Sequence, residues 1–219
     1  MTVIEPTLTT ERRILKEYPL LIACDEVGRG ALAGPVAVGA VVIDAERARK
    51  RVPRGLRDSK LVPAARRAEV AERAAAWTSA GAVGWASPAD IDDVGIMRAL
   101  GLATIRALDQ LRAQGVAVEQ ALVLLDGNHD YITPAGASGL QVRPVVKADR
   151  DCASAAAASV IAKVARDALM CELHDELPPY QWSRNKGYAS AEHRDAIRAH
   201  GLSDHHRRSW AIADAPTLF

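Results

Sequence analysis

The chain has 219 residues, of which 49% are hydrophobic and 25% charged, a composition typical of a globular protein with one large domain. Disordered, collagen-like and coiled-coil chains are excluded. The 28 Lys and Arg residues against 27 Asp and Glu residues leave a net charge of +1, so any nucleic-acid surface must be a local patch.

The cysteines and the apolar segments indicate the compartment. Three cysteines form an odd count with no CxxC spacing, which argues against a disulfide framework and against a zinc ribbon. The N-terminus is charged before its first apolar run, and the alanine-rich stretch 154–162 is too short to cross a bilayer. We therefore expect a cytoplasmic protein without a signal peptide or a membrane span.

The first half of the chain predicts strands followed by helices. Residues 19–24 and 36–43 are continuous apolar runs, typical of buried strands. A loop rich in Arg and Lys, interrupted by Pro and Gly, leads into a helix over 64–77. Residues 82–86 predict a third strand. The helix of about twenty residues that follows has apolar or small residues at spacings of three and four: Met97, Leu100, Thr104, Leu108 and Leu111.

The second half continues the alternation of strands and helices. Residues 121–125 and 141–146 predict strands, and a helix follows with Asp151 as its expected N-cap. One face of that helix carries Val160, Ile161, Val164, Ala168 and Cys171. From residue 177 the tail becomes rich in aromatic and basic residues and contains four of the six histidines. Such alternation predicts an α/β architecture.

Carboxylates follow three of the predicted strands: Asp25 with Glu26, then Asp126, then Asp149. Because the ends of neighbouring strands lie close together, these acids can converge, and their pKa values then rise unless cations neutralise them. Oxygen ligands favour Mg²⁺ or Mn²⁺, and paired ions of this kind support phosphodiester cleavage. Each acid alone is equally typical of a turn, as in the sequence Asp126-Gly127-Asn128.

The segment Gly28-Arg29-Gly30 has two interpretations. It matches a dinucleotide-binding loop only weakly, because such a loop opens a helix and here Pro35 and a valine-rich strand follow. A loop without side-chain bulk allows the backbone to approach a sugar or phosphate closely. An ordinary hairpin connection explains the same residues.

Three further segments keep a functional and a structural interpretation side by side. Ser59 and Lys60 in the charged loop can face a phosphate or belong to a solvated loop. Tyr188, between basic residues, suits stacking on a sugar or base, or packing. Residues 205–210 are either a phosphate-contacting patch or a structural tail.

Taken together, these motifs resemble those of the bacterial ribonuclease HII family. The resemblance covers roughly residues 19–212 in the family's order and rests on DEVGRGALAGP at 25–35, DSKL at 58–61, LLDGN at 124–128, KAD at 147–149 with AAAASVIAKVARD at 155–167, NKGY at 185–188 and HRRS at 206–209. Departures from the family pattern are Ala31, Gly95 and Cys24, and none of them removes a candidate ligand.

The resemblance implies a ribonuclease H-like fold, a mixed sheet flanked by helices with a small helical C-terminal extension. We expect one catalytic domain over 1–219, of which about 177–219 grips the substrate. It also implies an endonuclease that cuts the RNA strand of RNA–DNA hybrids and nicks 5′ of single ribonucleotides in duplex DNA, leaving 5′-phosphate and 3′-hydroxyl ends, in ribonucleotide excision repair and primer removal.

By the same resemblance, two Mg²⁺ or Mn²⁺ ions are held by Asp25, Glu26, Asp126 and Asp149. The residues expected to bind substrate are Gly28, Arg29, Gly30, Ser59, Lys60, Lys147 and Tyr188. The Gly28-Arg29-Gly30 backbone is expected to contact the 2′-hydroxyl, the group that distinguishes RNA from DNA, and Tyr188 to stack on the next sugar. Asp167 is expected to be structural.

Three other functions compete with this one. A junction resolvase or transposase-like nuclease leaves Gly28-Arg29-Gly30 and Tyr188 without a task, and a hybrid-binding module without catalysis requires a missing acid. A nucleotide-cofactor enzyme is the weakest alternative. We further expect a monomer, since the sequence has no long exposed apolar segment.

Overall fold

The computed structural model describes residues 5–210 and is built around one five-stranded sheet with the order β3-β2-β1-β4-β5. The strands are β1 (Leu20–Val27), β2 (Val36–Ile43), β3 (Ala80–Ala86), β4 (Ala121–Asp126) and β5 (Gln141–Val145). β2 pairs antiparallel with both β1 and β3, whereas β4 pairs parallel with β1 and β5. The mixed sheet expected from the sequence is therefore confirmed.

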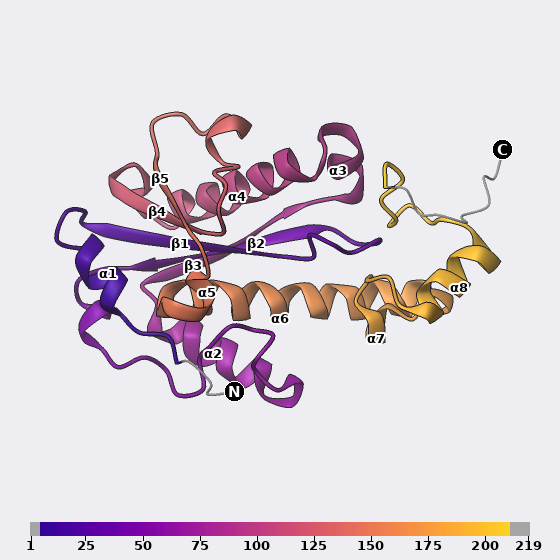
Figure 1. The fold of residues 1–219 in the computed structure, drawn as a ribbon, viewed down its shortest axis with the longest axis horizontal. Coiled ribbons are helices and arrows are strands. Elements are labelled where there is room, and N and C mark those ends of the chain that lie inside the picture. Colours follow the sequence, from indigo (N-terminus) through magenta and orange to yellow (C-terminus); the bar gives the residue numbers. More distant parts are fainter. Residues whose placement is uncertain (1–4, 211–219) are drawn as a thin grey trace.

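Helices cover both faces of this sheet (Figure 1). They are α1 (Thr9–Ile14), α2 (Arg67–Trp77), α3 (Pro88–Val94), α4 (Ile96–Ala113), α5 (Ala148–Asp151), α6 (Ala153–Glu176), α7 (Trp182–Asn185) and α8 (Ala191–His200). Short 3₁₀ helices lie at Arg47–Arg49, Ala64–Arg66, Val118–Gln120, Thr133–Ala135 and Pro178–Tyr180. α4 packs on one face of the sheet, and α6 lies on the other beside α2.

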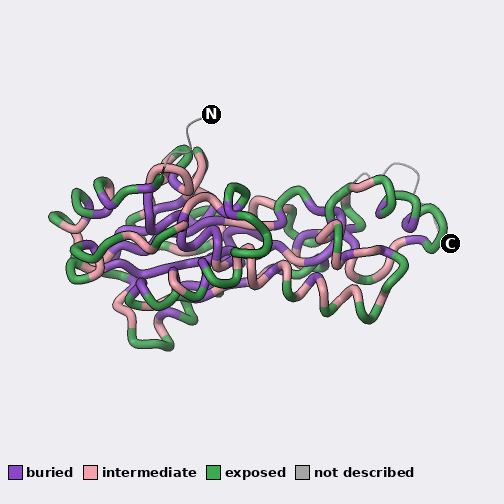
Figure 2. The backbone as a smooth tube through the Cα atoms, turned by 90° about the horizontal axis from the view of Figure 1, so that it is seen from below, coloured by how far each residue is buried: buried purple, intermediate pink, exposed green. Residues whose placement is uncertain are grey.

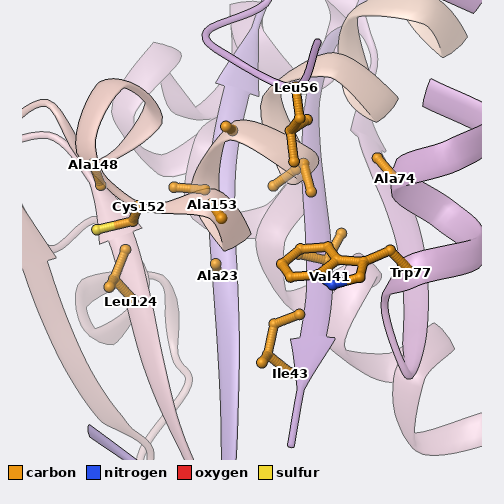
Figure 3. Close-up of a cluster of buried hydrophobic side chains, with 14 of the residues drawn as sticks. Ala23, Val41, Ile43, Leu56, Ala74, Trp77, Leu124, Ala148, Cys152 and Ala153 are labelled. Atoms are coloured by element: carbon orange, nitrogen blue, oxygen red, sulfur yellow. The ribbon is translucent and has the colours of Figure 1, made fainter. Parts of the chain in front are cut away.

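The central strands are apolar except for the acids near their ends, as expected where both faces of a strand are buried. Successive side chains of a strand point to opposite faces. Leu21 and Ala23 of β1 therefore join the core beneath α2 and α6, and Ile22 and Cys24 join the core beneath α4. Figure 3 shows Ala23 and its β2 neighbours Val41 and Ile43 in the first of these cores, close to Trp77.

The alanine-rich part of α6 is a close-packing surface against the sheet. Residues 155–158 are all alanine and all fully buried. A Cβ added at Gly39 of β2 would collide with the backbone carbonyl oxygen of Ala158. Small residues on both elements let the helix and the sheet approach closely, and this fixes the position of α6 beneath the strand ends.

Two details differ from the sequence expectation. Asp151 does not cap the long helix: it lies in α5 and pairs with Arg150 at 2.7 Å, while α6 starts after Cys152 without a side-chain cap. The helix expected after the third strand is two helices, α3 and α4. They separate at Gly95, whose φ of 78° interrupts the α-helical backbone.

The C-terminal extension projects from the end of the sheet and has its own small core (Figures 1 and 2). This core joins Leu32 and Met170 of the main body to Tyr180, Trp182 and Ile197. Part of the expected extension, residues 211–219, lies outside the described residues. Within the described part of the chain, every helix is too short or too polar to cross a bilayer.

Candidate active site

The four acids predicted from the sequence lie around one end of the sheet. Asp25 and Glu26 are in the last part of β1, and Asp126 is the final residue of β4, which pairs with β1. Asp149 lies in α5, directly after β5. Because side chains alternate along a strand, Asp25 faces the α6 side of the sheet and Glu26 the α4 side.

Asp126 also holds the segment that carries Asp149. Its Oδ1 atom accepts hydrogen bonds from the backbone N–H groups of Ala148, at 2.6 Å, and Asp149, at 3.4 Å. Lys147 just before them has a left-handed backbone with φ of 60°. The carboxylate at the end of β4 therefore orients the turn that follows β5.

The pKa values of all four carboxyl groups are raised. Asp25 is only 7% exposed, and burial raises its pKa well above the usual range, with Asp126, Glu26 and Asp149 adding repulsion and a Ser159 hydrogen bond opposing it. Burial and then the charge of Asp126 raise the pKa of Asp149 to about 6. Burial also raises the pKa values of Glu26 and Asp126. The protein only partly neutralises these negative charges.

The donor chemistry of this cluster fits hard divalent cations. All four groups offer carboxylate oxygens, and cations are what a set of mutually repelling carboxylates requires. In the conformation of residues 5–210, no three His, Cys, Asp or Glu side chains lie close enough together to hold an ion. The fit therefore rests on the charge and ligand type of the four side chains.

A cleft of about 480 Å³ opens beside Asp25 and Glu26. Its lining includes nearly all of the predicted substrate-binding residues: Gly28, Arg29, Gly30, Ser59, Lys60 and Tyr188. Lys147, the remaining predicted residue, is exposed and does not line this cleft. Asp126 lines a smaller adjoining cavity together with Glu26 and Arg29.

A basic groove of about 650 Å³ continues from this cleft towards the C-terminal extension. The two cavities share Arg67, Lys163 and Tyr188, and the groove adds Arg184 and Lys186. A chain with a net charge of only +1 thus has a concentrated basic surface beside its acids. Such a surface is suited to a phosphate backbone.

The loop carrying Ser59 and Lys60 is held by residues that the sequence interpretation missed. The Nε atom of Arg67 donates to the carbonyl oxygens of Ser59 and Val62, at 3.1 Å each. The buried hydroxyl of Ser159 on α6 donates to that of Ser59 at 3.0 Å. Lys163 pairs with Asp167 at 2.6 Å, consistent with the structural role expected for Asp167. Only tertiary contacts relate these residues, so no local pattern marks them.

Tyr188 lies at the junction of the cleft and the groove with 38% of its surface exposed. The guanidinium of Arg166 lies 5.7 Å from the centre of its ring. The backbone carbonyl of Tyr188 accepts a hydrogen bond from Nδ1 of His193 at 2.9 Å. Arg166 thus packs against the ring and His193 holds the backbone of Tyr188, while part of the ring stays exposed to the cleft.

A ribonuclease HII family model matches residues 22–213 of this chain. The chain belongs to the ribonuclease HII family. Ribonuclease HII of Streptomyces griseus subsp. griseus is 44% identical over 215 residues, covering 96% of this chain and 86% of the relative. That of Streptomyces avermitilis is 43% identical over 212 residues, covering 96% and 85%. As a member of this family, the protein is an endoribonuclease that acts on RNA–DNA hybrids.

Solved structures confirm the ribonuclease H-like fold. Bst-RNase HIII in complex with Mn²⁺ aligns with a TM-score of 0.71 at 20% identity, covering 95% of this chain and 71% of that one. Ribonuclease H2 from Pyrococcus horikoshii aligns with a TM-score of 0.64 at 22% identity, covering 89% and 95%. At these identities the two structures support the fold alone.

Proposed function

We propose that this ribonuclease is a metal-dependent endonuclease that nicks duplex DNA 5′ of a single embedded ribonucleotide, in addition to cutting hybrids. The observation that carries the proposal is one cleft whose lining combines Asp25 and Glu26 with the backbone of Gly28-Arg29-Gly30. A 2′-hydroxyl is the group that a bulk-free backbone loop can recognise beside hydrolytic acids. The products are a 5′-phosphate and a 3′-hydroxyl.

Asp25, Glu26, Asp126 and Asp149 would hold two Mg²⁺ or Mn²⁺ ions. When bound, such a pair supplies an activated water and charge stabilisation for the leaving oxygen. The raised pKa values of these carboxyl groups support this assignment, because a cation compensates for the repulsion that raises them. Asp126 has a second task, since its Oδ1 atom fixes the backbone that carries Asp149.

The remaining cleft residues bind and orient the nucleic acid. Burial opposes the charge of Lys60, but the charges of Asp58 and then of the nearby acids raise its pKa, so it is protonated at neutral pH and can contact a phosphate. Tyr188 stacks on the sugar beyond the ribonucleotide. The basic groove that runs on to Arg184 and Lys186 follows the duplex backbone along the C-terminal extension. Lys147 would contact phosphate from outside the cleft.

At the level of the cell, we propose one catalytic domain with a substrate-gripping extension that works as a cytoplasmic monomer. Ribonucleotide excision repair and removal of RNA primers are the two processes that need such a cut. Ribonucleotide-containing duplex DNA and RNA–DNA hybrids are its partners.

The deciding experiment uses a labelled DNA duplex with one ribonucleotide and the matched all-DNA duplex, each with Mg²⁺, Mn²⁺ or EDTA. We expect a nick 5′ of the ribonucleotide that requires metal, and no cut in the all-DNA duplex. Binding without a nick under either metal would instead identify a hybrid-binding module.

Tyr188→Ala tests the stacking assignment. We expect cleavage at a single ribonucleotide to fall about tenfold, because the loss of one base–aromatic or sugar–aromatic contact removes about 1–3 kcal/mol of binding. Cleavage of a long hybrid should fall less, since contacts along the groove remain. Equal losses on both substrates would refute stacking as the role of this ring.

A further inference from the structure

The loop between β1 and β2 is held by a buried arginine from the far end of the chain. Arg207 is fully buried, and its guanidinium is directed at backbone carbonyl groups. Nη2 donates to the carbonyl of Gly28 at 2.7 Å, and Nη1 donates to that of Arg29 at 2.8 Å. Nε and Nη2 also donate to the carbonyl of Gly34, at 3.2 and 3.1 Å. One side chain thus binds both ends of the loop.

This guanidinium stays charged at neutral pH and is fixed in place. Burial lowers its pKa to about 9, so it remains protonated at neutral pH. The ring of Trp210 lies 5.1 Å from its central carbon. No carboxylate among the described residues pairs with it, so its hydrogen bonds within the protein go to the loop carbonyls. Because the guanidinium is planar and rigid, it sets the orientation of the peptide groups that it binds.

Those hydrogen bonds determine where the loop N–H groups point. In a trans peptide unit the C=O and N–H bonds point in opposite directions. The carbonyls of Gly28 and Arg29 face Arg207, so the N–H groups of Arg29 and Gly30 face away from it. Both residues are exposed and line the cleft, and neither N–H has a hydrogen-bond acceptor within the described residues.

We propose that Arg207 is a positioning residue for ribonucleotide selection, holding the carbonyls of Gly28 and Arg29 so that the N–H groups of Arg29 and Gly30 face the substrate's 2′-oxygen. This inference rests on the proposed function of the cleft. Arg207 touches neither the acids nor the substrate. Its effect therefore falls on recognition of the 2′-hydroxyl and leaves the hydrolytic step itself unchanged.

A second buried arginine supports the loop without orienting these two peptide groups. Arg166 of α6 donates to the carbonyls of Pro35, Lys186 and Ala33, at 2.8, 2.9 and 3.1 Å. It joins the loop to the segment that carries Tyr188. Of the two arginines, only Arg207 binds the carbonyls of Gly28 and Arg29. The Gly28 carbonyl also accepts a hydrogen bond from the backbone N–H of Ala31, at 3.2 Å. Arg207 is therefore the side chain to test.

The test compares Arg207→Lys with the wild-type protein and with Arg112→Lys. Arg112 is a matched control because it is an arginine on the solvent side of α4, paired with Asp109 and Glu119. Steady-state cleavage of the single-ribonucleotide duplex gives KM and kcat. The all-DNA duplex, added as a competitor, gives an inhibition constant that depends on phosphate contacts and not on a 2′-hydroxyl.

For Arg207→Lys we expect KM to rise about tenfold, the effect of about one lost hydrogen bond, with kcat and the inhibition constant changed less than about twofold. A purely structural role predicts a lower kcat from a smaller folded fraction, with KM unchanged. An inhibition constant that rises in parallel with KM would mean general loss of nucleic-acid binding. Either result would overturn the proposal.

A measurement on a folded protein with intact Arg207 covers the case in which the variant does not fold. In the Asp126→Asn background, the backbone amide signals of Arg29 and Gly30 are followed by NMR during titration with each duplex. We expect both amides to shift with the ribonucleotide duplex and not with the all-DNA duplex; identical responses would refute the inference. If wild-type protein fails to nick the single-ribonucleotide duplex, the proposed function fails, and a long hybrid replaces that duplex in these comparisons.

Discussion

The acid cluster and the junction of the loop with the extension bury charge in opposite ways. Asp25 is buried among other carboxylates, and its pKa is raised well above the usual range. Arg207 is fully buried, and carbonyl groups of the loop accept its hydrogen bonds. The first region gathers like charges that external cations can compensate, whereas in the second the hydrogen bonds of the buried guanidinium are satisfied by the loop and hold its shape.

A substitution that removes one charge from the acid cluster should therefore reduce cleavage without disrupting the fold. Asp126→Asn retains the Oδ1 acceptor for Ala148 and Asp149 but removes the charge. We expect cleavage to fall about a thousandfold, because charge stabilisation at the reacting phosphate is lost. Cleavage assays should show this loss while fluorescence anisotropy shows hybrid binding close to that of the wild type. Near-normal turnover would mean that the metal-site assignment is wrong.

The loop junction should respond to added bulk at one glycine and tolerate it at another. A Cβ at Gly28, where φ is 85°, collides with the Arg166 side chain, whereas a Cβ at Gly30 meets no atom within 4 Å. We expect Gly28→Ala to lower the free energy of unfolding by about 3 kcal/mol. Gly30→Ala should change it by less than about 0.5 kcal/mol but weaken cleavage, because Gly30 lines the cleft that receives the substrate. Urea denaturation of the two variants measures the effect on packing, and cleavage assays measure the effect on substrate recognition. Equal stabilities of the two variants would contradict the expected difference between Gly28 and Gly30.

Protonation should weaken the extension, where a pair of buried histidines is in contact. Nε2 of His206 lies 3.2 Å from Nε2 of His193, which also accepts a hydrogen bond from Trp182 at 3.0 Å. Burial, followed by the charge of His193, lowers the pKa of His206 to about 4. The unfolded chain therefore binds more protons between pH 6.5 and 4, so stability falls as the pH falls through this window.

We expect a loss of about 2 kcal/mol between pH 7 and pH 4.5 from this pair, measured by urea denaturation with tryptophan fluorescence. The variant His206→Asn should flatten the pH dependence, and the exposed His129→Asn should leave it unchanged. An identical pH profile for all three proteins would exclude the histidine pair as the cause.

Removing one charge from the acid cluster should stabilise the metal-free protein. The pKa of Asp25 is higher in the folded than in the unfolded protein, so its ionisation destabilises the fold as the pH rises towards neutrality. Asp25→Asn should raise the free energy of unfolding in EDTA by about 1 kcal/mol at pH 7 while abolishing cleavage. The exposed Asp109→Asn serves as the control. A destabilised Asp25→Asn would show that this carboxylate has a structural role.

Local patterns identified most of the fold and the acids. The apolar runs predicted the positions of all five strands, and the carboxylates that follow these runs, Asp25, Glu26, Asp126 and Asp149, lie around one end of the sheet as expected. The expected cap at Asp151 was wrong, because Asp151 pairs with Arg150 within a separate short helix. Capping depends on the path of one turn, and composition alone does not determine that path.

The sequence by itself determined which segments are apolar enough to form strands, which carboxylates follow them, and the family. These features depend only on residue types and short spacings. Tertiary structure alone decided which groups support the site. Arg207 lies 178 residues along the chain from the Arg29 carbonyl that it binds, and Ser159 lies 100 residues from Ser59. Lys147 was expected among the substrate-binding residues, yet it lies outside the cleft. Contacts between distant segments form only when the sheet, α6 and the extension pack together, so no spacing in the sequence encodes them.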